Sequence, residues 1–337
     1  MFKVFKIDIS NTEIVIPLAY NAFLYNYYRK NKIDNYQNEV LLSDELVDIL
    51  KNDLDCIYNE FSNKTIIIDF QNIASCNRAF KEYSTGDFLS TLVFANVQKD
   101  AIVESRIEEG IKSFKKNVSG NYSYFATNRH KNELAINLDF NSVYENYIVE
   151  ILKNNKVISE NENKSNFLDS SGIYSTSYIH IKKIFHSFPD YLYIIYKLSE
   201  KIVNMNVDKI DALISTSKTG GIIATLVGNL LGIKVIHCLG LGPKNILPIE
   251  TINEKLRKNR NYFLVSDFIC IGTEIKIINT IMMCSKANLI GGISVASYID
   301  LTNSKYSNSI IGKMSTLINI VKHGVDYNIS GYEYKGE

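Results

Sequence analysis

Apolar and polar stretches alternate along the second half of this 337-residue chain in a pattern that predicts strands followed by helices. Residues 262–265 are apolar, which is long enough for a buried strand and too short for a helix. Apolar residues then recur at helical spacing from Ile275 to Met282. A polar loop from Ser266 to Glu274 separates the two patterns. The sequence therefore predicts a strand, a loop and a helix in succession.

A second stretch with the same pattern comes earlier in the chain. Residues 210–214 read as a strand, residues 215–221 as a loop of small residues, and residues 222–231 as a helix, with a further strand at 233–237. Two such stretches in tandem predict a parallel sheet that carries both loops at its carboxyl edge. Helix N-termini present unpaired N–H groups and a positive dipole end, so the loops are predicted to hold a nucleotide-like or phosphorylated ligand.

The first half of the chain has an α/β pattern of its own. Residues 2–9 and 12–17 predict a strand pair, residues 43–61 a helix capped by Ser43, and residues 65–69 a buried strand that ends at Asp69. The fold class predicted for the whole chain is α/β, with a smaller domain of this kind before the parallel sheet.

A polar segment separates the two halves. Residues 153–166 are almost devoid of large apolar side chains, which is typical of a linker. We therefore predict a domain of residues 1–152, a linker of residues 153–166 and a domain of residues 167–337.

Composition narrows the classes of protein. The chain is 46% hydrophobic and 22% charged, as globular proteins are, and its net charge of +1 gives no reason to expect a nucleic acid or an anionic membrane as partner. The five cysteines form no C-x-x-C pair, and the apolar runs are too short for a signal peptide or a membrane span, so we expect a cytoplasmic protein. The histidines lack metal-ligand spacing, and no metal site is predicted.

Three motifs in the second half resemble those of the type I phosphoribosyltransferases, in particular the orotate branch. Residues 266–274, Ser-Asp-Phe-Ile-Cys-Ile-Gly-Thr-Glu, are similar to the ribose-phosphate loop, and residues 215–221 stand where the pyrophosphate loop would be. Residues 166–178 are similar to the start motif and keep Phe167 and Tyr178. The resemblance covers roughly residues 160–337 and implies a Rossmann-like parallel sheet.

The resemblance also implies roles for individual residues. Asp267 would face the ribose as the catalytic residue. The remaining ligand-binding residues would come from the ribose-phosphate loop, the pyrophosphate loop and the connector between them: Ser266, Gly272, Thr273 and Glu274; Ser215, Thr216, Ser217, Lys218, Thr219, Gly220 and Gly221; and Lys244. Magnesium is expected only as a companion of bound phosphoribosyl diphosphate. The resemblance further implies a homodimer.

The sequence departs from the family pattern at positions that matter for catalysis. Ser266 replaces the first acid, Ile271 and Glu274 replace hydroxyl residues, and Ser170 replaces the lysine of the start motif. A carboxylate at Glu274 competes with phosphate for the helix N-terminus, since two like charges at about 4 Å repel by about 4 kcal/mol near a protein surface. These departures favour binding without catalysis.

The stretch from Thr65 to Phe80 resembles the central strand and following turn of STAS domains. In the sigma-regulator branch a phosphorylated Ser or Thr follows this strand, but that position falls near Arg78 here. The resemblance thus implies an N-terminal STAS-like domain that docks a protein partner.

Three hypotheses follow. The favoured one is a regulatory protein that binds a nucleotide or phosphoribosyl metabolite through a changed phosphoribosyltransferase-like domain. The alternative is an active orotate-type phosphoribosyltransferase, so enzymatic activity is left open. The third is a purely structural domain, in which Asp267 caps a turn and the loop glycines only shape turns.

Overall fold

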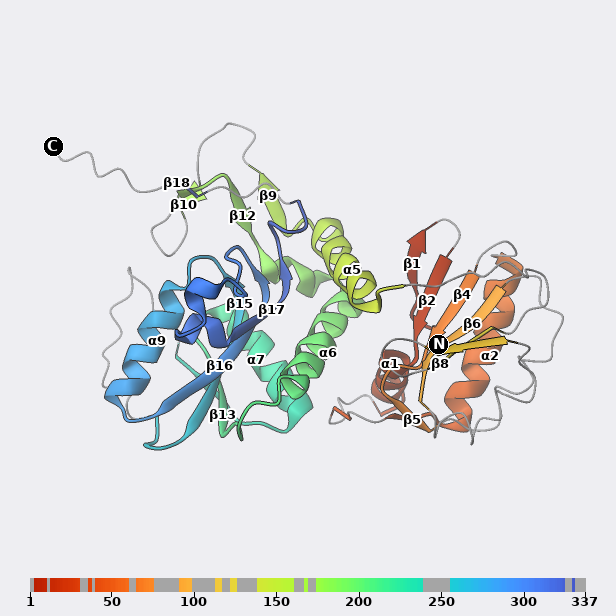
Figure 1. The fold of residues 1–337 in the computed structure, drawn as a ribbon, viewed down its shortest axis with the longest axis horizontal. Helices are drawn as coiled ribbons and strands as arrows, with labels where there is room; N and C mark the ends of the chain where they lie inside the picture. Colours follow the sequence, from red (N-terminus) through yellow and green to blue (C-terminus); the bar gives the residue numbers. More distant parts are fainter. Residues whose placement is uncertain are drawn as a thin grey trace. The chain divides into compact units, whose positions relative to one another are not determined.

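The computed structural model describes two compact units of the chain, Met1–Asp139 and Phe140–Glu337 (Figure 1). The described residues are 3–10, 13–30, 36–37, 40–60, 65–75, 91–98, 113–116, 122–125, 138–160, 167–168, 174–238, 255–324 and 329–330. No helix within these ranges is both long and apolar enough to cross a membrane.

The first unit contains a six-stranded mixed sheet in the order β1-β2-β4-β6-β8-β7. Its strands are β1 (Ile7–Ser10), β2 (Glu13–Pro17), β4 (Thr65–Asp69), β6 (Thr91–Val97), β7 (Ser113–Lys116) and β8 (Tyr122–Phe125). Strands β2, β4 and β6 are parallel, and β1, β7 and β8 pair antiparallel. A short pair, β3 (Val40–Leu41) and β5 (Ile73–Ser75), lies outside this sheet.

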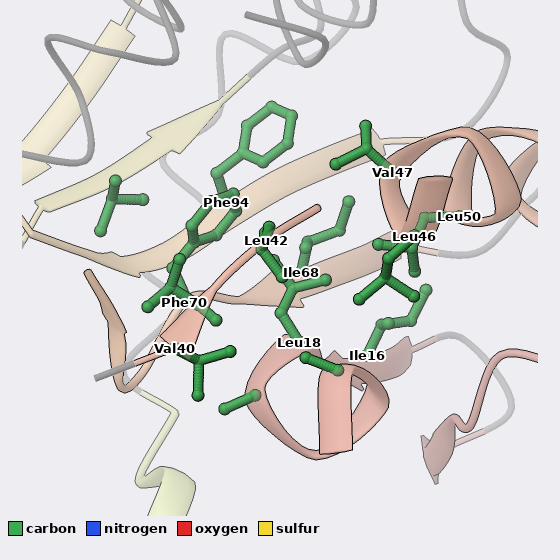
Figure 2. Packing of buried hydrophobic residues seen from close by; sticks show 14 of the residues in the cluster. Ile16, Leu18, Val40, Leu42, Leu46, Val47, Leu50, Ile68, Phe70 and Phe94 are labelled. Atoms are coloured by element: carbon green, nitrogen blue, oxygen red, sulfur yellow. The ribbon is translucent and has the colours of Figure 1, made fainter. Parts of the chain in front are cut away.

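The first unit also contains helices α1 (Leu18–Lys30) and α2 (Asp44–Glu60). The apolar side of α2, at helical spacing in the sequence, supplies Leu46, Val47 and Leu50 to a buried cluster with Ile16 and Ile68 of the strands (Figure 2). Asp69, at the end of β4, is buried and accepts hydrogen bonds from the Gln71 N–H at 3.0 Å and the Asn96 Nδ2 at 2.7 Å. The STAS-like character of this unit stays a prediction.

The second unit begins earlier than the polar segment suggested. The units divide between Asp139 and Phe140, whereas the predicted boundary lay at residues 152–153. Helix α5 (Phe140–Asn154) belongs to the second unit because its apolar side, which includes Ile148 and Leu152, is buried against that unit's own β17. Within the predicted linker, Ile158–Glu160 form strand β9, which pairs with β12 (Ser177–Ile179).

The second unit is built on a five-stranded sheet in the order β14-β13-β15-β16-β17, in which every pair is parallel. The strands are β13 (Ala212–Ser215), β14 (Val235–His237), β15 (Asn261–Ile269), β16 (Asn288–Ser297) and β17 (Met314–Asn319). The main helices are α6 (Phe188–Asn204), α7 (Lys218–Leu231) and α9 (Thr273–Cys284). The smaller elements are β10 (Phe167–Leu168), β11 (Tyr174–Ser175), β18 (Ile329–Ser330) and the 3-10 helices η3 (Ile181–His186), η4 (Ser304–Tyr306) and η5 (Ile310–Lys313).

The strand order reverses direction between β13 and β15. From β13 the chain passes through α7 to β14 on one side, and from β15 it passes through α9 to β16 on the other. Right-handed crossovers in opposite directions place their helices on opposite faces of the sheet, and Figure 1 shows α9 on one side and α6 with α7 on the other. Such a reversal opens a crevice outside the carboxyl ends of the two central strands. We call it the switch-point crevice.

Both predicted loops are shorter than expected. Strand β15 continues to Ile269 because its second half still pairs with β16, with Ser266 opposite Ser294, after β13 has ended at Ser215. Helix α7 begins at Lys218 rather than at residue 222, since the Ser217 hydroxyl caps it by accepting the Gly220 N–H at 2.9 Å. The prediction of a parallel sheet is confirmed, whereas Ser266 and Asp267 belong to a strand and residues 218–221 to a helix.

Candidate functional site

A pocket of about 130 Å³ lies at the switch-point crevice. It is lined by Leu264, by residues 266–275, which run from β15 into the first turn of α9, by Ser217, and by Tyr178 and Ile179 of β12. Five of the predicted site residues of the second loop therefore share one cavity: Ser266, Asp267, Gly272, Thr273 and Glu274.

Two hydrogen bonds join the predicted loops across the crevice. The Ser217 hydroxyl donates to Oδ1 of Asp267 at 2.8 Å, and the Thr216 hydroxyl donates to Oε2 of Glu274 at 2.9 Å. Each carboxylate of one loop thus accepts a hydroxyl of the other. The two loops meet at one edge of the sheet, and Asp267 is half-buried rather than enclosed in the core.

The remaining predicted residues of the first loop lie around this cavity rather than in it. Ser215 and Thr216 are buried, Thr219 is half-buried, and Lys218 is exposed on the first turn of α7. None of these four lines the pocket. Lys244 lies outside the described residues, as does the Ser171–Gly172 part of the start motif.

Two glycines bring the start of α7 close to its neighbours. A β-carbon at Gly220 would lie 3.3 Å from the Val265 carbonyl oxygen and 3.4 Å from the Asp267 nitrogen. A β-carbon at Gly221 would lie 3.1 Å from Nδ1 of His237. The close approach of neighbouring atoms, rather than an unusual backbone angle, therefore explains why glycine stands at both positions. Gly272 differs, because it caps α9 with φ at 79° in the left-handed region.

His237 is a contact residue that the sequence did not point to. Its Nδ1 lies 3.0 Å from the Ser215 hydroxyl and its Nε2 lies 3.4 Å from the Thr225 hydroxyl, which donates to the Gly221 carbonyl at 2.8 Å. Ser215 and His237 are register partners at the ends of β13 and β14. The available signal was a polar residue at the carboxyl end of each strand: Ser215 directly follows the predicted strand 210–214, and His237 ends the predicted strand 233–237. Their contact fixes the base of the first loop.

The pocket carries negative charge. Asp267 and Glu274 are its carboxyl groups, and none of the described residues that line it is a lysine, arginine or histidine. Glu274 occupies the first turn of α9, where the helix dipole stabilises a carboxylate. Carboxylate oxygens accept hydrogen bonds only, so the site is suited to ligand groups that donate, such as sugar hydroxyls.

Three cysteines of the second unit provide a test of the described burial. Cys284 is exposed, Cys270 is half-buried in the pocket lining, and Cys238 is buried. Burial raises the pKa of the Cys238 thiol to about 11. Because the thiolate is the reactive form, we expect iodoacetamide at about pH 9.5 to modify Cys238 roughly twentyfold more slowly than Cys284. Peptide mass spectrometry over time measures both rates, and equal rates would contradict the burial of Cys238.

Comparison with solved structures finds likenesses to phosphoribosyltransferases. Orotate phosphoribosyltransferase from Aeropyrum pernix is 12% identical over 52% of this chain and 95% of its own, with a TM-score of 0.38. Adenine phosphoribosyltransferase from Thermoanaerobacter pseudethanolicus is 16% identical over 51% and 99%, with a TM-score of 0.39. UMP synthase from Leishmania donovani is 11% identical over 90% and 59%, with a TM-score of 0.41.

No family model matches the chain, and no curated protein matches it. The predicted resemblance to type I phosphoribosyltransferases is confirmed as a likeness to solved structures that covers about half of the chain.

Proposed function

We propose that the C-terminal unit binds a nucleotide or a related ribosyl or phosphoribosyl metabolite in the switch-point crevice, and that this binding serves regulation rather than group transfer. The observation that carries the proposal is the pair of hydroxyl–carboxylate contacts, Ser217 to Asp267 and Thr216 to Glu274, at the reversal of the strand order. Open parallel sheets bind their ligands at such reversals.

A sugar fits both the chemistry and the size of the pocket. Asp267 and Glu274 each accept a hydroxyl group, and a carboxylate has about four acceptor positions, so a ligand hydroxyl can donate to either of them while Ser217 and Thr216 keep their hydrogen bonds. The volume of about 130 Å³ is below the ~300–1,000 Å³ of pockets that enclose a whole ligand. The sugar would therefore occupy the pocket, and the rest of the ligand would extend beyond it.

The changed ribose-phosphate loop argues for binding without transfer. The side chain beside Asp267 is the neutral Ser266, which is buried and whose hydroxyl donates to the Phe268 carbonyl at 3.4 Å. A cationic, oxocarbenium-like sugar needs preorganised negative charge around it, and this position supplies none. Ile271 presents an apolar side chain, 37% exposed, where the family has a hydroxyl.

Magnesium enters the proposal only with a diphosphate ligand. Within the described ranges no group of three or more His, Cys, Asp or Glu side chains could hold a metal ion. Magnesium is commonly held by one or two carboxylates together with ligand phosphates and water, and Asp267 and Glu274 could supply those carboxylates.

A regulatory role would require another protein that distinguishes the ligand-bound form from the ligand-free form. We propose that the N-terminal unit docks such a partner and that the protein forms a homodimer. Light scattering of the purified chain measures directly whether it forms a homodimer.

A thermal-shift screen tests the proposed function. The probes are phosphoribosyl diphosphate, nucleosides, nucleoside monophosphates and orotate, each with and without magnesium. A ligand at a hundred times its dissociation constant stabilises the folded state by about 2.7 kcal/mol, which raises the melting temperature by about 5–10 °C. We expect at least one ribosyl probe to produce this shift.

Pyrophosphate release distinguishes the two functional hypotheses. With phosphoribosyl diphosphate, magnesium and a panel of nucleobases, the proposal predicts release no faster than in buffer alone. Release that depends on protein and nucleobase would establish an active transferase and contradict the regulatory reading. A screen without any thermal shift would contradict ligand binding altogether.

A further inference from the structure

We propose that Glu274 excludes a 5-phosphate from the switch-point crevice, so that the site selects ribosyl compounds with a free 5-hydroxyl, such as nucleosides. The inference rests on the proposed function and specifies its ligand class. It makes Glu274 the residue that determines specificity.

Glu274 stands where an anion would bind at α9. It is the second residue of the helix, and it lines the pocket together with Gly272 and Thr273 of the same turn. The unpaired N–H groups and the dipole of a first helical turn favour one negative group close by, and the protein supplies that group itself.

A hydrogen bond from the loop after β13 holds the Glu274 carboxylate in this position. Its Oε2 accepts the Thr216 hydroxyl at 2.9 Å, and Thr216 is only 4% exposed. A hydrogen bond to a charged acceptor in such a sheltered place is stronger than one between neutral groups. An incoming phosphate would have to displace the carboxylate from Thr216 as well as from the helix.

The charges around the pocket oppose a phosphate further. Asp267 adds a second carboxylate to the lining, and no lining residue within the described ranges is a lysine, arginine or histidine. Lys218 is exposed and does not line the pocket. A ligand phosphate with a unit charge about 6 Å from a carboxylate is repelled at the effective dielectric constant of ~20 that applies near protein surfaces. This repulsion lowers the affinity for the phosphorylated ligand roughly a hundredfold.

An uncharged 5-hydroxyl meets no such penalty. The Thr216 hydroxyl already shows the contact it would make, since it donates directly to the Glu274 carboxylate. A sugar hydroxyl can donate to the same oxygen or to the second oxygen of the carboxylate, which has about four acceptor positions in all. The site is therefore complementary to a 5-hydroxyl and repels a 5-phosphate.

Isothermal titration calorimetry with matched ligand pairs tests the inference. The pairs are ribose and ribose 5-phosphate, uridine and UMP, and adenosine and AMP, each titrated without magnesium into the full chain. In each pair that binds, we expect the wild-type protein to bind the unphosphorylated ligand roughly a hundredfold more tightly than the phosphorylated one. Glu274→Gln keeps the shape of the side chain and removes its charge, so it should shrink this preference to about tenfold or less.

Asp208→Asn is the matched control. Asp208 is an exposed acid that precedes β13, at the opposite end of the sheet from the crevice, so its replacement removes the same charge elsewhere. It should leave the preference unchanged. Glu274→Thr, which restores a hydroxyl at the helix N-terminus, is a second variant should Glu274→Gln fold poorly.

The outcomes distinguish a failure of the role of Glu274 from a failure of ligand binding as a whole. Tighter binding of the phosphorylated members by the wild-type protein, or a preference that Glu274→Gln and Glu274→Thr leave intact, would overturn the role of Glu274 while ligand binding stands. An absence of binding for every pair in the wild type and in both variants would overturn the role of Glu274 together with the proposed function.

Discussion

Replacement of Asp267 with asparagine is expected to weaken the binding of a ribosyl ligand about a hundredfold while the protein remains folded. The side chain lines the crevice from β15 and accepts the Ser217 hydroxyl at 2.8 Å. Asparagine has the same shape and can still accept that hydroxyl, so the loops should stay joined. It loses the charge and presents an NH2 group to ligand hydroxyls that need an acceptor.

Calorimetry with the ligand that gives the largest thermal shift measures this loss. The melting temperature of the unliganded variant should lie within a few degrees of the wild-type value, since a half-buried side chain keeps its contact. Asp208→Asn again serves as the charge-matched control and should bind normally. Unchanged affinity in Asp267→Asn would show that the ligand does not bind at Asp267.

Replacement of Gly292 with alanine should lower the free energy of unfolding by about 3 kcal/mol. Gly292 lies inside β16, opposite Leu264 of β15 and Met314 of β17. A β-carbon there would come within 2.7 Å of the Leu264 carbonyl oxygen and 2.8 Å of the Leu264 β-carbon. Neither atom belongs to the flexible end of a side chain, so the strands themselves would have to separate.

Urea unfolding of the purified protein measures the change. Ser294→Ala is the control because Ser294 lies two residues further along the same strand, is fully buried, and its hydroxyl has no partner among the described residues. Its removal should leave stability unchanged or raise it by up to about 1 kcal/mol. Equal stability of Gly292→Ala and the wild type would contradict the described spacing between β15 and β16.

The parallel sheet was predictable because short apolar runs bounded by polar loops leave little choice of element. The exact ends of the elements were not. Strand β15 passes through Ser266 and Asp267 because β16 continues beside it, and the length of a pairing partner cannot be read from the strand itself. The early start of α7 had a local signal in Ser217, which is a common N-cap residue and donates to Asp267 as well.

The grouping of site residues was predictable only in part. Loop order along the sheet brought residues 215–221 and 266–274 to one edge, and that prediction is confirmed by the contacts of Ser217 and Thr216. The contributions of Tyr178 and Ile179 come from β12, which lies outside the five-stranded sheet. Their place depends on tertiary packing, for which periodicity in the sequence gives no signal.

The early end of the first unit has a similar cause. A polar run marked residues 153–166 as a linker, yet α5 before it packs its apolar side on β17, far away in the sequence. Polarity along the chain reports exposure, whereas membership of a unit depends on which partner covers the apolar side.

Hydrogen–deuterium exchange with the best-binding ribosyl probe shows whether the ligand lies between the two loops. We expect slower exchange in peptides that cover residues 215–221 and 266–274, because a ligand in the switch-point crevice would order both segments at once. Protection confined to the N-terminal unit, or to peptides of the second unit that include neither segment, would contradict it.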